Sequence, residues 1–194
     1  MKKLIILLTV LLTASFAFAM VDTDPDMMGM YFDEDADLPC LDGVAPYSTH
    51  NLYIIITNPS FDLLFGWEAG YDLLGPAQVL STGFPPEQLP LDVGGNPGNH
   101  IVGFGEPMIM GPVNIVAFVA VLYMDTELGP LDFILHGADP GSLPGDLPVV
   151  LLADGVLMTL GLSAADGLVA QINGGCQVVS TENLSFEGIK SLYR

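Results

Sequence analysis

The segment from Leu64 to Leu74 constrains the fold more than any other part of the chain. Its sequence, LFGWEAGYDLL, alternates between two kinds of residue. The odd-numbered positions are apolar: Phe65, Trp67, Ala69, Tyr71 and Leu73. The even-numbered positions between them are glycine or acidic: Gly66, Glu68, Gly70 and Asp72. Because successive side chains of a strand point to opposite faces, this pattern predicts a β-strand with a buried apolar face and a solvated one. Such a strand needs a second apolar layer, which favours a two-layer β protein.

Other segments of strand character are spread along the chain and separated by turns rich in glycine and proline. They are expected at 28–33, 51–58, 77–82, 100–105, 114–124, 131–136, 149–153, 156–160 and 168–173. The segment 114–124 is apolar at both parities, which indicates a central strand covered on both faces or in contact with a partner, although a buried helix would have a similar composition. Residues 83–99 predict a long loop. Many short strands joined by such turns predict an all-β antiparallel sandwich of two sheets, jelly-roll or immunoglobulin-like.

Residues 1–19 have the features of a secretory signal peptide. Lys2 and Lys3 precede an apolar run that starts at Leu4, and small residues lead to an expected cleavage after Ala19. The alternative is an uncleaved membrane anchor, but the run is short for a span of about 20 residues. We therefore expect a bacterial protein that is secreted or held at the cell surface, with no membrane span once the leader is removed.

Removal of the leader leaves a strongly acidic chain. Only Lys190 and Arg194 remain against 23 acidic residues, which gives a net charge of −21 with neutral histidines, and no lysine or arginine occurs between Met20 and Ile189. Such a surface repels phosphate backbones and excludes nucleic acid as a partner. It leaves cations, neutral polymers and basic protein surfaces as partners. The charge could equally serve only to keep an exported protein soluble.

Beyond the leader the chain is expected to divide into three parts: an acidic lead-in at 20–27, a sandwich domain at 28–178 and a tail at 179–194. In the lead-in, Asp22, Asp24 and Asp26 have the spacing of the first three ligands of a calcium loop. The sixth loop position is Met27 instead of glycine, however, and the twelfth is Asp33 instead of glutamate. We therefore favour a solvated acidic segment over a calcium site, and we expect no cofactor.

The chain has two cysteines, Cys40 and Cys176. In an exported protein an even number of cysteines favours a disulfide. Two buried free thiols or a metal pair are the alternatives, and two thiols alone make a poor zinc site. The bridge would enclose most of the domain and would have a structural role.

The tail differs from the rest of the chain. Ser185 can cap a short amphipathic helix with Glu187 in its first turn, and apolar residues recur at helical spacing toward the basic end. This stripe either packs on the sandwich or forms a recognition segment read by export machinery or a partner. The residues concerned are Phe186, Ile189, Lys190, Leu192, Tyr193 and Arg194.

Two resemblances accompany these patterns. The tail, FEGIKSLYR, resembles the Trp-Gly-x-Ile/Val-Lys-x-Leu-Tyr/Phe-Arg ending of exported, uncharacterised bacterial proteins, and departs from it at Phe186 and Glu187. The body, with GWEAGYDLLGPAQVLSTG before a long apolar strand, resembles the cohesin-like and related immunoglobulin-like sandwiches. That resemblance implies a module for protein–protein attachment at the cell exterior.

Motifs of catalysis are missing from the sequence. It has no G-x-S-x-G elbow, no H-E-x-x-H and no glycine-rich phosphate loop with a lysine. Its histidines, His50, His100 and His136, stand in unrelated contexts. Glu68 and Asp72 share a strand face about 13 Å apart, too far for the usual carboxylate pair of a glycosidase. We therefore expect no enzyme, and a hydrolase is the least favoured function.

A carbohydrate-binding module is the stronger alternative, because such modules share sandwich folds. They use an exposed row of aromatic residues. Trp67 lies on the predicted core face, and Tyr47, Phe61 and Phe84 lie in loops without a common spacing. The sequence thus favours a non-catalytic binding or structural module for protein attachment, and it leaves the oligomeric state open.

Overall fold

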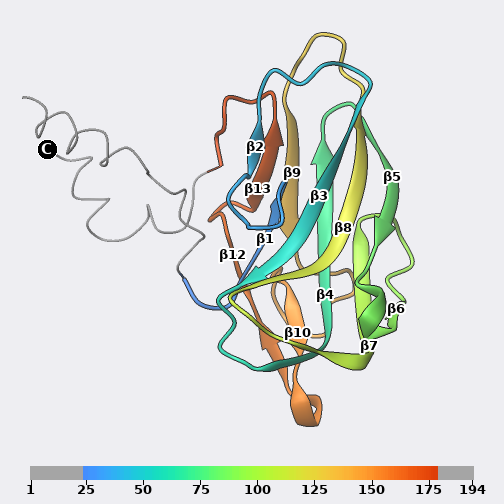
Figure 1. Cartoon of the computed structure of the whole chain (residues 1–194), viewed down its shortest axis with the longest axis vertical. Coiled ribbons are helices and arrows are strands. Elements are labelled where there is room, and N and C mark those ends of the chain that lie inside the picture. The colour runs from blue at the N-terminus through green and yellow to red at the C-terminus, as the bar shows by residue number, and fades with distance from the viewer. Residues whose placement is uncertain (1–23, 179–194) are drawn as a thin grey trace, which may run out of the picture.

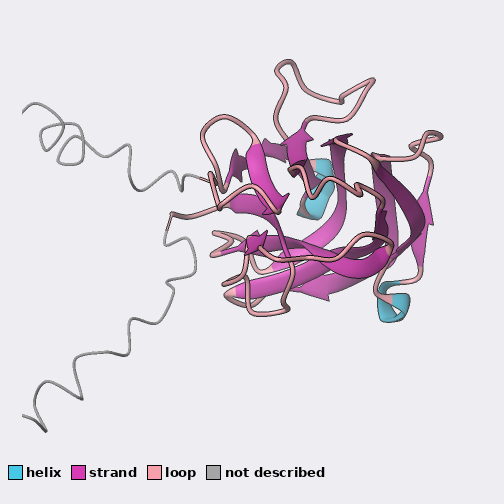
Figure 2. Cartoon of the chain, turned by 90° about the horizontal axis from the view of Figure 1, so that it is seen from above, coloured by secondary structure: helices cyan, strands magenta, loops and turns pink. Residues whose placement is uncertain are grey.

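The computed structural model describes residues 24–178, which form two β-sheets packed face to face (Figure 1). The predicted signal peptide, Asp22 and the predicted tail helix lie outside the described residues. The two-sheet all-β architecture expected from the alternation is confirmed. Seen from above, the strands surround a single interior and loops connect them at the ends (Figure 2). In the part of the chain described, no helix is long and apolar enough to cross a membrane.

The first sheet has five strands in the order β12-β1-β3-β8-β5. Their bounds are β12 Gly161–Leu162, β1 Met27–Tyr31, β3 Ser48–Thr57, β8 Val113–Tyr123 and β5 Ala77–Gly83. The second sheet has eight strands and is built around β4, which pairs with β7 along one edge and with β9 and β10 along the other. Their bounds are β4 Leu63–Leu74, β7 Asn99–Ile109, β6 Pro90–Asp92, β9 Leu131–His136, β10 Val149–Leu151, β11 Leu157–Thr159, β13 Leu168–Ile172 and β2 Cys40–Leu41.

Two sequence predictions about the strands need correction. The segment 83–99 is more than a loop, because it contains the 3-10 turn η1 at Pro86–Gln88 and strand β6. The sheets are also not wholly antiparallel, since β1 pairs with β12 and β2 pairs with β13 in parallel. A parallel pair needs a long connection between its strands. Here almost the whole domain separates each early strand from its late partner.

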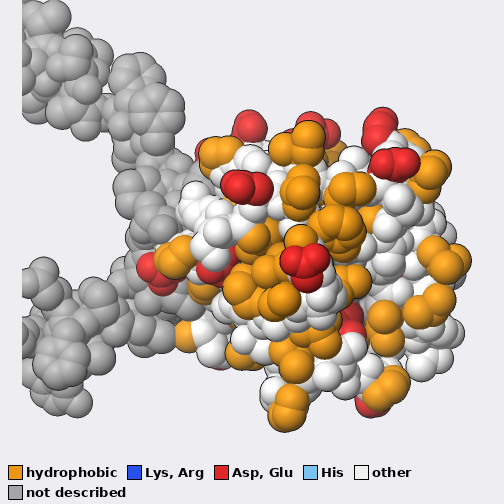
Figure 3. Space-filling view, turned by 90° about the horizontal axis from the view of Figure 1, so that it is seen from below, with side chains coloured by type: hydrophobic (Ala, Val, Ile, Leu, Met, Phe, Trp, Pro, Cys, Tyr) orange, Lys and Arg blue, Asp and Glu red, His pale blue; other side chains and the backbone are white. Residues whose placement is uncertain are grey.

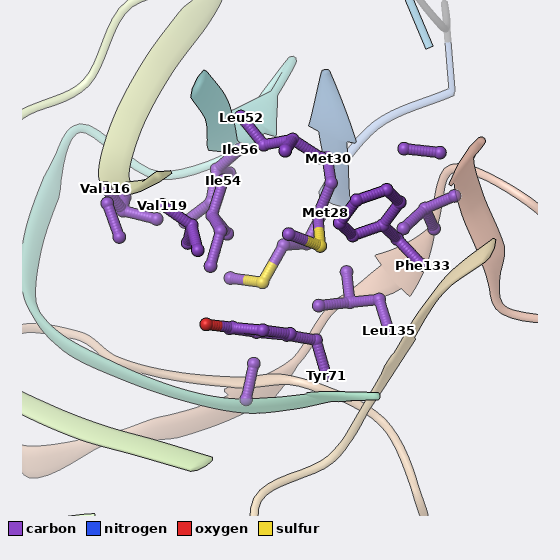
Figure 4. Packing of buried hydrophobic residues seen from close by; sticks show 14 of the residues in the cluster. Met28, Met30, Leu52, Ile54, Ile56, Tyr71, Val116, Val119, Phe133 and Leu135 are labelled. Atoms are coloured by element: carbon purple, nitrogen blue, oxygen red, sulfur yellow. The ribbon is translucent and has the colours of Figure 1, made fainter. Parts of the chain in front are cut away.

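The core lies between the two sheets. Figure 4 shows Met28, Met30, Leu52, Ile54, Ile56, Val116 and Val119 of the first sheet opposite Tyr71, Phe133 and Leu135 of the second. The long apolar segment is strand β8, as β-branched composition favoured. Its inner face is buried, whereas Phe118 on its outer face is 43% exposed and covers Gly83. The prediction of cover on both faces is therefore only partly met.

Strand β4 follows the predicted alternation except at its beginning. Trp67, Ala69 and Tyr71 point into the core, and Trp67 is only 2% exposed. Phe65 was expected on the same face, but the register between β4 and β7 shifts between Leu64 and Gly66. Only Phe65 of β4 lies between these two paired positions, against four residues of β7 between Gly103 and Met108, so the regular alternation is interrupted there. Leu64 is consequently buried in place of Phe65, which is only partly buried.

The predicted disulfide is confirmed, with the Cα atoms of Cys40 and Cys176 5.4 Å apart. Cys40 begins β2, which pairs with β13, and Cys176 lies just beyond the end of β13. Asn173 reinforces this edge, because its side chain accepts a hydrogen bond from the Val44 amide and donates one to the Val44 carbonyl. The segment around Cys40 and the C-terminal end of the described chain are thereby fixed to one edge of the second sheet.

Candidate functional site: an apolar groove on the second sheet

The outer face of the second sheet carries a row of directly paired residues that runs across five strands. Because paired residues of neighbouring strands point to the same face, the register places five positions side by side. From β6 through β7, β4 and β10 to β11 they are Leu91, Gly103, Gly66, Leu151 and Leu157. Two glycines therefore stand in the middle of a row that has leucines at its ends. Gly103 leaves a hollow that the leucines border, whereas at Gly66 an added Cβ would collide with the backbone carbonyl of Val102.

This hollow is an apolar groove of about 310 Å³, comparable to the smaller ligand pockets of proteins. A side-chain Cβ built at Gly103 would meet no atom within 4 Å, so the space above this residue is open. Leu91, Val93 and Leu157 border the groove and are 67%, 64% and 40% exposed. Apolar side chains gathered in this way around a hollow are typical of binding surfaces.

A second row of paired residues forms the other side of the groove. It runs from Ile101 of β7 through Glu68 of β4 to Val149 of β10. Glu68 was expected on a solvated strand face, but it is only 4% exposed. Its carboxylate accepts hydrogen bonds from the Ser142 amide at 2.6 Å and the Ser142 hydroxyl at 2.7 Å. The loop that carries Ser142 covers this carboxylate, so the prediction of a solvated face is wrong at Glu68.

The hairpin of β10 and β11 borders a second apolar hollow. This hollow has a volume of about 390 Å³ and is lined by Phe61, Asp62, Leu63, Leu152, Ala153 and Val156. The view from below, at the end of the molecule where the hairpin lies, shows hydrophobic side chains gathered together with acidic ones among them (Figure 3). The described residues contain no lysine or arginine, so every formal charge around both hollows is negative unless a histidine is protonated.

Beneath the groove, on the inner face of the same strands, lies an aromatic cluster around His100. The His100 ring lies 6.0 Å from Trp67, 5.8 Å from Tyr71 and 5.7 Å from Phe84, measured between ring centroids. Its Nδ1 lies 2.7 Å from a carboxylate oxygen of Asp92 in β6. This pair joins β6 to β7 and holds the strand that supplies Leu91 to the groove.

The environment of Asp92 favours its ionised form. Burial alone would raise the pKa of this carboxyl group. Hydrogen bonds from His100 and from the backbone amides of Gly94 and Ile101, together with the charge of His100, outweigh burial and hold the pKa of Asp92 below its usual value. A carboxylate therefore stays close to the groove at neutral pH.

The predicted calcium ligands are only partly within the structure. Asp26 accepts hydrogen bonds from the amide and hydroxyl of Ser60, at 2.6 and 2.8 Å. Within residues 24–178, no group of three or more histidine, cysteine, aspartate or glutamate side chains is placed to hold a metal ion. Asp24 lies at the start of this range and Asp22 before it, so the weak calcium prediction stays untested.

The three histidines lie in separate places. His50 Nε2 lies 2.8 Å from the Ser48 hydroxyl, and burial lowers the pKa of His50. His136 Nδ1 lies 2.6 Å from the Gly137 carbonyl, with Asp72 3.6 Å from its Nε2. These contacts and the His100–Asp92 pair join no serine, histidine and carboxylate into a triad within the described part of the chain.

The aromatic residues considered for sugar binding are not arranged as a platform. Tyr47 is 68% exposed, whereas Phe61 and Phe84 are partly buried against the core. Phe84 packs on Trp67 at 6.2 Å between centroids, beneath the groove and not on the surface. The predicted recognition residues of the tail lie outside the described residues.

The solved structures that are similar to this chain include cohesin modules. The sixth cohesin of scaffoldin B from Acetivibrio cellulolyticus, solved in complex with a Cel5 dockerin, is 10% identical, with 76% of this chain and 96% of that chain covered and a TM-score of 0.49. The seventh ScaB type I cohesin from Pseudobacteroides cellulosolvens is 13% identical, with coverage of 76% and 89% and a TM-score of 0.44.

A third similar structure is the solution structure of CaCohA2 from Clostridium acetobutylicum, 12% identical, with coverage of 69% and 84% and a TM-score of 0.40. No protein-family model matches the chain, and no curated protein matches its sequence.

Sequence reasoning missed the groove, although one of its signals was visible. The alternation of β4 placed Gly66 and Glu68 on the outer face, as the structure has them. It could not show that Gly103 stands opposite Gly66, or that Leu91 and Leu151 flank the two glycines. These residues come from four strands that are distant in sequence.

Proposed function

We propose that the protein is an exported, non-catalytic binding module that attaches to another protein through the groove on its second sheet. The occupant is an extended apolar segment that carries at least one lysine or arginine. The observation that carries this proposal is the row in which Gly66 and Gly103 stand between leucines, of which Leu91 and Leu157 are exposed, beside an apolar hollow on the outer face of the sheet.

The charges in and around the groove support a basic partner. The described residues that surround the groove carry acidic side chains and no lysine or arginine, and the Glu68 carboxylate lies just beneath the groove lining, covered by the Ser142 loop. Attraction between unlike charges is stronger at a partly buried site than in open water. An acidic or phosphorylated segment would be repelled, so the groove selects by charge as well as by shape.

Two other functions are less well supported. Sugar binding would use an exposed aromatic surface, and the only tryptophan is 2% exposed. Hydrolysis would need a nucleophile, a base and an acid in contact, and the described histidines are dispersed. The disulfide supports action outside the cytoplasm, because reducing compartments rarely preserve such bonds.

Peptide display tests the proposal. The chain from Met20 onward is exposed to a random peptide library, and enriched peptides are measured by fluorescence anisotropy. We expect apolar peptides with lysine or arginine, whose affinity falls with salt. The Leu91→Ser variant should bind them about tenfold more weakly, because it loses most of one buried leucine contact.

The matched control is Leu80→Ser, on β5 of the other sheet, where the leucine is 50% exposed. It should bind as the wild type does. Enriched peptides without basic residues, or equal binding by Leu91→Ser and the wild type, would contradict the proposal. Retention on insoluble polysaccharide would favour the sugar-binding function instead.

A further inference from the structure

We infer that the groove is occupied by the chain's own C-terminal segment, residues 179–194. This inference rests on the proposed function, because it takes the groove to be a site for apolar segments with basic residues. It adds that the protein carries such a segment itself, so that an external partner has to compete with an internal one.

Charge complementarity is the first argument. From Met20 onward, the only lysine and arginine of the chain are Lys190 and Arg194. The body that carries the groove, residues 24–178, has many acidic side chains and no lysine or arginine, so the only permanent cations that the chain can offer it lie in the last five residues. Unlike charges within one chain attract without the loss of translational freedom that a separate partner incurs.

The chemistry of the segment is the second argument. Besides its cations it contains the apolar residues Phe186, Ile189, Leu192 and Tyr193. These match a hollow whose rim is formed by Leu91, Val93 and Leu157. The acidic body offers no other segment that combines large apolar side chains with positive charge.

The length of the segment is the third argument. The described chain ends at Val178, which packs against the main core. The twelve residues from there to Lys190 span up to about 40 Å when extended. In the second sheet, β13 is separated from β4 of the groove by β9 alone, and neighbouring strands lie about 5 Å apart, so an extended segment of this length can reach the groove along the surface of its own domain. A tether of this kind gives a local concentration in the millimolar range, which favours the chain's own tail over a second copy.

Trypsin provides a direct test, because it cleaves after lysine and arginine. Between Met20 and Arg194, Lys190–Ser191 is the only peptide bond that follows a lysine or an arginine. The rate at which residues 191–194 are lost, followed by mass spectrometry, therefore reports how often this bond is released. We expect cleavage of the folded protein to be at least about tenfold slower than cleavage of a synthetic 179–194 peptide.

Two matched variants locate the protection. Leu91→Ser in the groove should accelerate cleavage about tenfold, because the tail loses an apolar contact. Leu80→Ser on the other sheet should leave the rate unchanged. Both replaced leucines are exposed, and urea unfolding of each variant confirms that the fold is retained.

Three results would overturn the inference: cleavage as fast as that of the free peptide, equal rates for the two variants, or protection that increases with protein concentration. The last result would assign the groove to the tail of a second copy. None of these three trypsin results changes what the peptide-display experiment is expected to show. A groove that binds basic apolar peptides while its own tail is cleaved freely would therefore leave the proposed function standing and refute the tail as occupant.

Discussion

Removing the disulfide should lower the stability of the protein by a large and calculable amount. The bridge joins residues 136 positions apart, so it closes a loop that contains nearly the whole described domain. In the chain-entropy model, a loop of this length is worth about 5 kcal/mol at 25 °C, because the cross-link reduces the freedom of the unfolded chain. Typical domains have an unfolding free energy of only about 5–15 kcal/mol. The Cys40→Ser/Cys176→Ser variant should therefore lose a third or more of its stability.

Urea unfolding of the oxidised wild type and the double variant measures this difference. With a slope of about 1–3 kcal/mol per molar urea, the midpoint should fall by about 2 M or more. The reduced wild type is the control and should unfold close to the double variant. A loss below about 1 kcal/mol would refute the reasoning, because it would mean that the unfolded chain is already restricted without the bridge.

Two further predictions concern the charges near the groove. Ser142→Ala should lower the unfolding free energy by about 1.5–3 kcal/mol, because a buried carboxylate loses one of its donors, whereas Ser60→Ala at the more exposed Asp26 should lower it by less than about 1 kcal/mol. Equal losses of unfolding free energy in the two variants, measured with urea, would show that burial of Glu68 does not strengthen its hydrogen bond with Ser142. Asp92→Asn should destabilise the fold at neutral pH, because a carboxylate with a lowered pKa stabilises the folded state above its unfolded value of 3.8. This contribution is lost as the pH falls through the folded-state pKa, so the difference from the wild type should shrink in acid; a difference that widens below pH 4 would contradict the assignment.

The strands were predictable because their information is local. In β4, Trp67, Ala69 and Tyr71 occupy alternate positions, and a period of two fixes which face is buried whatever the partner strand is. The disulfide was predictable for a different reason. The chain has two cysteines and a predicted secretory leader, and an even number of cysteines in an exported protein favours a disulfide. Where the pattern failed, at Phe65, the irregular pairing with β7 interrupts the alternation.

The groove was not predictable, because it depends on register between strands that are far apart in sequence. The sequence around Gly66 and Gly103 does not show that strand pairing places the two glycines side by side. The sequence around Glu68 likewise does not show that the loop of Ser142 covers its carboxylate. Strand β6, which brings Leu91 to the rim, was too brief to show a clear period and fell within the expected loop 83–99, whereas β11, which brings Leu157, was expected at 156–160.

By itself, the amino-acid sequence determined that this chain makes two stacked sheets, which side of the central strand is buried, and where its scarce positive charge lies. These properties follow from the order of residues along one strand or one segment. The tertiary structure alone decided that two glycines meet, that leucines surround them and that a carboxylate is buried beside the hollow. Those properties arise only when distant segments come together, because cross-strand register is set by the packing of the whole domain.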